Sequence, residues 1–229
     1  MVTVNGQSHL LIQNSIAFLD ITDFNDIFSH KQLIDENIAS DKIVVFAVIW
    51  NSQHIPCNKP QAQKLELYKW LNSLPILSII VVDTDCYDEL LELMMMFDIR
   101  LSGKNISIRF PDDDSKFVFN FEERCQLLMG NEINVDGYRN LLKKTLYLDD
   151  VYVQRLINQI IDIDDIQNEV QKYVNRIISN KDNYHIKSII KCFNNYKLLG
   201  LKADRKLLLE EEAKQFCALI VKSYLKMRS

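Results

Sequence analysis

Glu92 is the residue best placed for acid/base chemistry, because it is the one charged residue in the apolar run from Leu90 to Phe97. A helix that is apolar on all sides is buried, so we expect its carboxylate in a desolvated setting. Buried acids are candidates for general acid/base catalysis, although structural ion pairs bury acids too. Arg100 is the candidate partner for such a pair, and the residues alone leave both interpretations open.

The elements around Glu92 follow the order strand, turn, helix. Residues 76–82 form an apolar run rich in β-branched side chains, which is typical of a strand covered on both faces. The run ends in a polar turn at residues 83–85. Asp85 is expected to cap a helix over residues 88–97, with Asp88 completing an acidic capping box.

The rest of the chain changes character once. Strand-like and helical segments alternate up to about residue 110, which predicts α/β units packed in layers. Beyond residue 121 the apolar spacing of threes and fours predicts helices. The expected strands are 8–13, 43–50, 76–82 and 106–110, and the expected helices are 24–38, 61–74, 88–97, 151–163, 166–178, 186–199 and 203–227. We therefore expect an α/β core over residues 1–145 and a helical region over 146–229.

Composition excludes several function classes. The 229 residues include five glycines and no glycine-rich phosphate loop, which argues against nucleotide-dependent enzymes. A net charge of −4 argues against nucleic-acid binding. Residues 185–229 nevertheless carry ten Lys/Arg and four Asp/Glu. That excess fits a solvated helical face, or a patch for the phosphates of coenzyme A or an acidic carrier protein.

Cysteine and histidine usage predicts a cytoplasmic protein without a metal site. Five cysteines stand far apart with no C-x-x-C pair, as expected for reduced, buried thiols. The four histidines neither cluster nor show ligand spacing. No segment reaches 18 apolar residues, so no membrane span is expected.

Residues 74–112 resemble the centre of the crotonase (enoyl-CoA hydratase/isomerase) superfamily. Leu74-Pro75-Ile76 matches the family's Lys-Pro-Val strand entry, and Phe97-Asp98-Ile99-Arg100 matches its Cys-Asp-Ile-Arg. Pro111-Asp112 matches its second acidic site, and a thinner likeness covers nearly the whole chain. The resemblance implies an α/β fold with a crotonase-like layered ββα core and a helical C-terminal region.

The resemblance also implies roles for three residues. Glu92 would be a general acid/base, Asp112 its partner, and the Glu89 backbone N–H a donor of the oxyanion hole. Coenzyme A would enter as part of a thioester substrate, with no separate cofactor. Two departures weaken the oxyanion hole: Asp88-Glu89-Leu90 replaces the family's glycine triplet, and residues 51–57 lack the family's second donor loop.

Two function hypotheses follow from the resemblance. The first is a hydratase, dehydratase or isomerase for acyl-CoA or carrier-bound thioesters, with a degenerate oxyanion hole, in a polyketide or acyl-CoA pathway. The second is a non-catalytic accessory subunit that assembles with or activates a partner enzyme. In both, the apolar stripe of residues 203–227 predicts a homotrimer or a mixed oligomer with a related subunit. A helical scaffold unrelated to crotonases is a third alternative.

Overall fold

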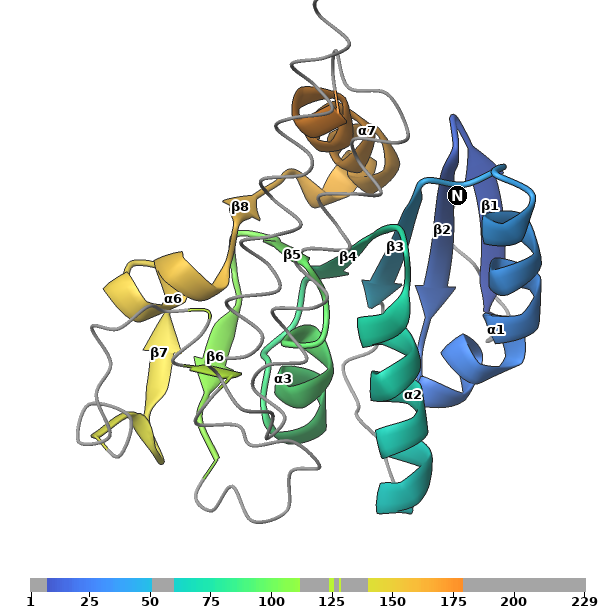
Figure 1. Cartoon of the computed structure of the whole chain (residues 1–229). Helices are drawn as coiled ribbons and strands as arrows, with labels where there is room; N and C mark the ends of the chain where they lie inside the picture. The colour runs from blue at the N-terminus through green and yellow to red at the C-terminus, as the bar shows by residue number, and fades with distance from the viewer. Residues whose placement is uncertain (1–7, 51–59, 112–123, 126–127, 129–139, 179–229) are drawn as a thin grey trace, which may run out of the picture.

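The computed structural model describes residues 8–50, 60–111, 124–125, 128 and 140–178. Its main sheet has six strands in the order β1-β2-β3-β4-β5-β8 (Figure 1). The β1 strand is antiparallel to β2, and each later neighbouring pair is parallel. The strands are β1 (His9–Gln13), β2 (Ile16–Ile21), β3 (Val45–Trp50), β4 (Leu77–Val82), β5 (Ile99–Ser102) and β8 (Gln159–Ile160).

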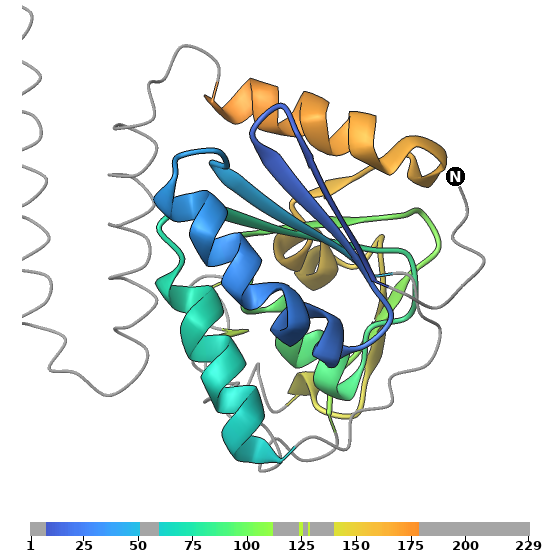
Figure 2. The ribbon, with the colours of Figure 1, turned by 90° about the vertical axis from the view of Figure 1, so that its right-hand side faces the viewer.

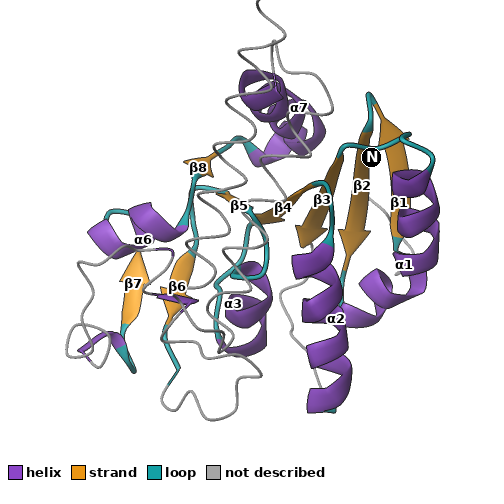
Figure 3. Cartoon of the chain, viewed as in Figure 1, coloured by secondary structure: helices purple, strands orange, loops and turns teal. Residues whose placement is uncertain are grey.

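Helices cover both faces of this sheet. The α1 and α2 helices lie on one face, and α7 lies on the other (Figure 2). The helices are α1 (Phe24–Ala39), α2 (Gln61–Ser73), α3 (Asp88–Met94), α6 (Val151–Leu156) and α7 (Ile166–Ile178), with a short 3-10 helix, η2 (Ile163–Asp165). A second, two-stranded antiparallel sheet pairs β6 (Ser107–Arg109) with β7 (Thr145–Tyr147) (Figure 3).

The strand β3 shows why the sheet lies between two layers. All six of its residues are buried, as expected for a central parallel strand. Phe46 and Val48 pack in the cluster that holds the buried faces of α1, α2 and α3. Ala47 and Ile49 pack in a second cluster with Val170 of α7. Alternate side chains of one strand therefore fill two cores.

Local sequence signals fix the helices that flank the site. Asp23 and Asp26 form a capping box at the start of α1. The α2 helix ends at Ser73, and Leu74 has an extended backbone with ψ of 125°, as expected for a residue before proline. Pro75 and Ile76 then lead into β4, which begins at Leu77.

The predicted layered α/β fold is confirmed. The strands expected near residues 8–13, 43–50, 76–82 and 106–110 are present, and α7 has its expected bounds. The sequence did not indicate β2, β5, β7 or β8. No helix within the described residues is long and apolar enough to cross a membrane.

The helix predicted over residues 151–163 is wrong beyond Leu156. There the chain turns and pairs with the edge of β5. The Asn158 N–H donates to the Arg100 carbonyl at 2.8 Å, and the Asn158 side-chain oxygen accepts from the Arg100 N–H at 2.8 Å. An unpaired sheet edge offers backbone hydrogen bonds that compete with helix continuation.

The division into a core over residues 1–145 and a helical region over 146–229 stays a prediction. Residues 146–178 bring β8 to the main sheet. The expected helices 186–199 and 203–227, and the basic segment, lie outside the described residues.

Candidate functional site

The turn before α3 is held by the small sheet. The Cys86 N–H donates to the Ser107 carbonyl at 2.8 Å, and the Arg109 N–H donates to the Cys86 carbonyl at 2.9 Å. The expected cap role of Asp85 is wrong, because α3 begins at Asp88 with Tyr87 before it. Asp85 instead accepts from the N–H and hydroxyl of Ser107, both at 2.8 Å. These bonds fix where α3 starts.

The first residue of α3 keeps a backbone conformation that suits glycine. Asp88 has φ of 45°, in the left-handed region. Residues 88–90 replace the glycine triplet of the resembled family, yet Asp88 still adopts this conformation. Aspartate tolerates the left-handed region better than most side chains, so the turn persists at some cost in strain.

Glu89 presents two groups at this turn. Among the described residues, its backbone N–H finds no acceptor, whereas the N–H groups of Leu90 and Leu91 both donate to the Tyr87 carbonyl. Its carboxylate forms an ion pair with the ammonium of Lys64 on α2. That pair neutralises one of the two carboxylates that start the helix. The role of the Glu89 N–H as an oxyanion donor stays a prediction.

Glu92 is buried between α3 and α2, as the apolar run predicted. Its exposed fraction is 1 %, and its Oε2 accepts from the Tyr68 hydroxyl at 3.2 Å. Burial and the nearby Glu92 carboxylate raise the pKa of Tyr68 well above its usual value, so the phenol stays a donor. The Glu92 side chain is therefore held by a hydrogen bond that sequence analysis missed.

Electrostatics within the group follow from burial and from Glu92. Burial, and then the Glu92 carboxylate, raise the pKa of Glu89 to about 7 even beside the Lys64 ammonium. Burial lowers the pKa of Lys64, and Glu92 opposes that shift. A carboxyl with a pKa near neutrality can both give and take a proton at physiological pH.

The second acid and the second donor loop lie outside the described residues. Asp112 comes directly after Pro111, where the described segment ends, and residues 51–57 fall in the gap between 50 and 60. Their roles stay predictions. Within the described part of the chain, no group of His, Cys, Asp and Glu side chains is placed to hold a metal ion.

An ionic cluster in which both arginines are buried and Asp98 is half-buried supports the end of α3. The Asp98 Oδ2 accepts from the Ser78 N–H at 2.9 Å and from the Ser78 hydroxyl at 2.6 Å. The Arg100 guanidinium donates to the Leu156 and Phe97 carbonyls, at 2.5 and 2.7 Å, and the Arg124 guanidinium donates to the Met95 carbonyl at 2.8 Å.

The two guanidinium groups share an acidic neighbour. Burial lowers the pKa of both Arg100 and Arg124 to about 10, while the Asp98 carboxylate acts in the opposite direction on both. The cluster joins β4, β5 and the segment after α3. It therefore fixes the far end of the helix that carries Glu92.

Comparison with solved structures identifies the fold. An enoyl-CoA hydratase/isomerase family protein from Silicibacter pomeroyi is 12% identical, with a TM-score of 0.70 over 95% of this chain and 98% of its own. ThnE from S. clavuligerus is 13% identical, with a TM-score of 0.67 over 89% of this chain and 99% of its own. A Thermobifida fusca protein solved in complex with CoA is 12% identical, with a TM-score of 0.67 over 96% and 95%.

The chain therefore has the crotonase fold. No family model matches the sequence, and no curated protein matches it. Identities of this size establish the fold alone, so activity has to be argued from the site.

Proposed function

We propose that the protein acts on acyl thioesters, either acyl-CoA or carrier-bound, as a hydratase, dehydratase or isomerase with a degenerate oxyanion hole. The observation that carries the proposal is the start of α3. Asp88 keeps the left-handed turn, and Glu89 offers an N–H without an acceptor in the described residues. The buried Glu92 carboxylate follows one helical turn later. Solved neighbours that are described as enoyl-CoA hydratases/isomerases, and one bound to CoA, support this choice.

Each group has a role in the proposed reaction. The Glu89 N–H donates to the thioester oxygen as it becomes an enolate, and Glu92 transfers the proton to or from the acyl chain. Asp112 is the second acid. The oxyanion hole is degenerate for an electrostatic reason, because a carboxylate in the first turn of α3 opposes the negative charge that develops on the thioester oxygen. One donor of such a hole is commonly worth about 3 kcal/mol.

Hydration of crotonyl-CoA tests this function. The isolated protein should hydrate it measurably, at about one hundredth or less of the rate expected with an intact hole. Glu92→Gln should lower that rate by about a hundredfold, because it removes the acid/base group but keeps the shape. Glu66→Gln is the matched control, since Glu66 is an exposed helical residue paired with Lys31.

Two results would contradict the proposal. Equal rates for the wild type and Glu92→Gln would remove Glu92 as the acid/base. A fast wild-type reaction that Glu92→Gln abolishes would keep the enzyme but remove the degenerate hole.

A second candidate is a non-catalytic subunit that activates a partner enzyme of the same fold. The burial of Glu92, which is 1 % exposed and hydrogen-bonded to the Tyr68 hydroxyl, favours it. In that case the protein alone hydrates nothing. It raises the turnover of its partner equally as wild type and as Glu92→Gln.

Both candidates include association. We propose a homotrimer, or a mixed oligomer with a related subunit, formed through the apolar stripe of residues 203–227. Light scattering at micromolar concentration should give a mass near three times the 26.8 kDa of one chain, or a mixed complex when a partner is present. A monomer under both conditions would contradict the association.

A further inference from the structure

Four polar side chains lie between α2 and α3, and the proposed reaction uses only one of them, that of Glu92. Lys64 and Tyr68 lie one turn apart on α2, and Glu89 and Glu92 lie one turn apart on α3. Lys64 binds the Glu89 carboxylate, and Tyr68 binds the Glu92 carboxylate. Residues three or four apart share a helix face, so the two pairs form one group. The group holds two carboxyls and one ammonium.

Exposure differs sharply across this group. The Glu92 residue is 1 % exposed, whereas the Glu89 side chain is 20 % exposed. The Lys64 side chain, at 7 %, lies between these values. A base that takes a proton from a substrate has to release it before the next cycle. Glu92 has almost no exposed surface through which to release a proton to solvent. Glu89, on the same helix face, is partly exposed.

We propose that the Glu89 carboxyl relays protons between solvent and Glu92. This inference rests on the proposed function, because it supplies the proton exchange that Glu92 needs between turnovers. In one direction the O–H bond of protonated Glu89 breaks as an O–H bond forms on the Glu92 carboxylate. Glu89 then takes a new proton from hydronium, and the Lys64 ammonium keeps its charge throughout. In this relay the Glu89 carboxyl affects the substrate only through Glu92.

The charges that face Glu89 suit a relay. Among the described residues, the Lys64 ammonium from α2 pairs with its carboxylate, the Glu92 carboxylate acts on it from its own helix, and the Tyr68 hydroxyl donates to Glu92. With Lys64 charged and Tyr68 neutral, one proton shared by the two carboxyls makes the group neutral. The pKa of the Glu89 carboxyl, about 7, leaves this group close to half protonated at physiological pH. Proton transfer in either direction is easiest under that condition.

A carboxyl titration tests the relay without any substrate. The full-length protein, labelled with ¹³C at the glutamate carboxyls, is titrated by NMR, and Glu89→Gln assigns the signal. Glu89 should titrate near pH 7 in the wild type. In Glu92→Gln its midpoint should fall, because a neighbouring negative charge is gone. Glu66→Gln should leave it unchanged. A Glu89 midpoint within one unit of 4.5, or one that ignores Glu92→Gln, would overturn the relay.

Turnover then separates the relay from the proposed function. With crotonyl-CoA, Glu89→Gln should slow hydration at least about tenfold and remove the rate change centred near pH 7, while Glu66→Gln changes neither. A wild-type rate and pH profile in Glu89→Gln would refute the relay and leave the function standing. A third outcome is that the wild type fails to hydrate crotonyl-CoA while the titration midpoint of Glu89 still falls in Glu92→Gln. In that case the proposed function is contradicted, and the proton coupling between Glu89 and Glu92 is supported.

Discussion

Replacing Asp98 with alanine is expected to lower the free energy of unfolding by about 3–5 kcal/mol. The change leaves the buried guanidinium groups of Arg100 and Arg124 without the carboxylate that faces both, and it removes two hydrogen bonds from Ser78. Urea unfolding followed by circular dichroism measures the effect. Asp149→Ala, the same substitution at an exposed position, should stay within about 0.5 kcal/mol.

Asp98→Asn separates charge from hydrogen bonding in this cluster. Asparagine still accepts from Ser78 but no longer balances the guanidinium groups. If charge dominates, Asp98→Asn should lose nearly as much stability as Asp98→Ala. A loss below about 1 kcal/mol for Asp98→Ala would mean that the two arginines are held by their carbonyl acceptors alone.

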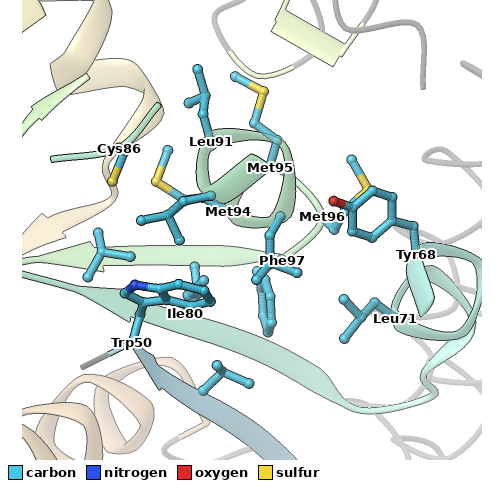
Figure 4. Packing of buried hydrophobic residues seen from close by; sticks show 14 of the residues in the cluster. Trp50, Tyr68, Leu71, Ile80, Cys86, Leu91, Met94, Met95, Met96 and Phe97 are labelled. Carbon is cyan, nitrogen blue, oxygen red and sulfur yellow. The ribbon is translucent and has the colours of Figure 1, made fainter. Parts of the chain in front are cut away.

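Phe97→Ala is the second large effect, with an expected loss of about 3–5 kcal/mol. Phe97 is fully buried just after α3, and Figure 4 shows it and Met94 turned towards the sheet that carries Trp50 and Ile80. Truncation opens a cavity that surrounding side chains fill only in part. The same urea experiment measures it, and Leu33→Ala, at a residue 46 % exposed, is the control with little expected change.

A small loss for Phe97→Ala would itself be informative. Met94, Met95 and Met96 precede Phe97 in the chain and are all buried, and Met94 is turned towards the same sheet as Phe97 (Figure 4). Methionine is unbranched and adapts to irregular spaces, so a cost of about 1 kcal/mol would mean that a neighbouring side chain such as Met94 refills the cavity. Such a result would contradict the expected cavity at Phe97.

Strong local periodicity explains how much of the fold the sequence predicted. The apolar runs of β3 and β4 and the apolar stripe of α7 are local patterns, 6 residues long in each strand and 13 in the helix. The β8 strand has two residues and forms only because the edge of β5 is nearby. No local pattern could indicate it.

The sequence predicted the candidate site only in part, because some of its features are local and others are not. The burial of Glu92 followed from its apolar neighbours. Its partner Tyr68 stands 24 positions earlier, and Lys64 stands 25 positions before Glu89. Pairings over such separations depend on how α2 packs against α3. The i, i+4 spacing of a lysine and a tyrosine on α2 was the available hint, and it is common on helices.

The left-handed backbone of Asp88 has a consequence for recognising chains that share this fold. Five non-glycine residues have positive φ in the described chain, namely Asn14, Ser15, Asp41, Asp88 and Lys143. Each such residue costs about 1–2 kcal/mol unless its side chain bonds locally, and packing elsewhere offsets the cost. A turn that suits glycine can therefore form in a sequence that has no glycine there. Searches that weight the glycine triplet would pass over proteins of this kind, whereas the backbone angle at the start of the buried helix would find them.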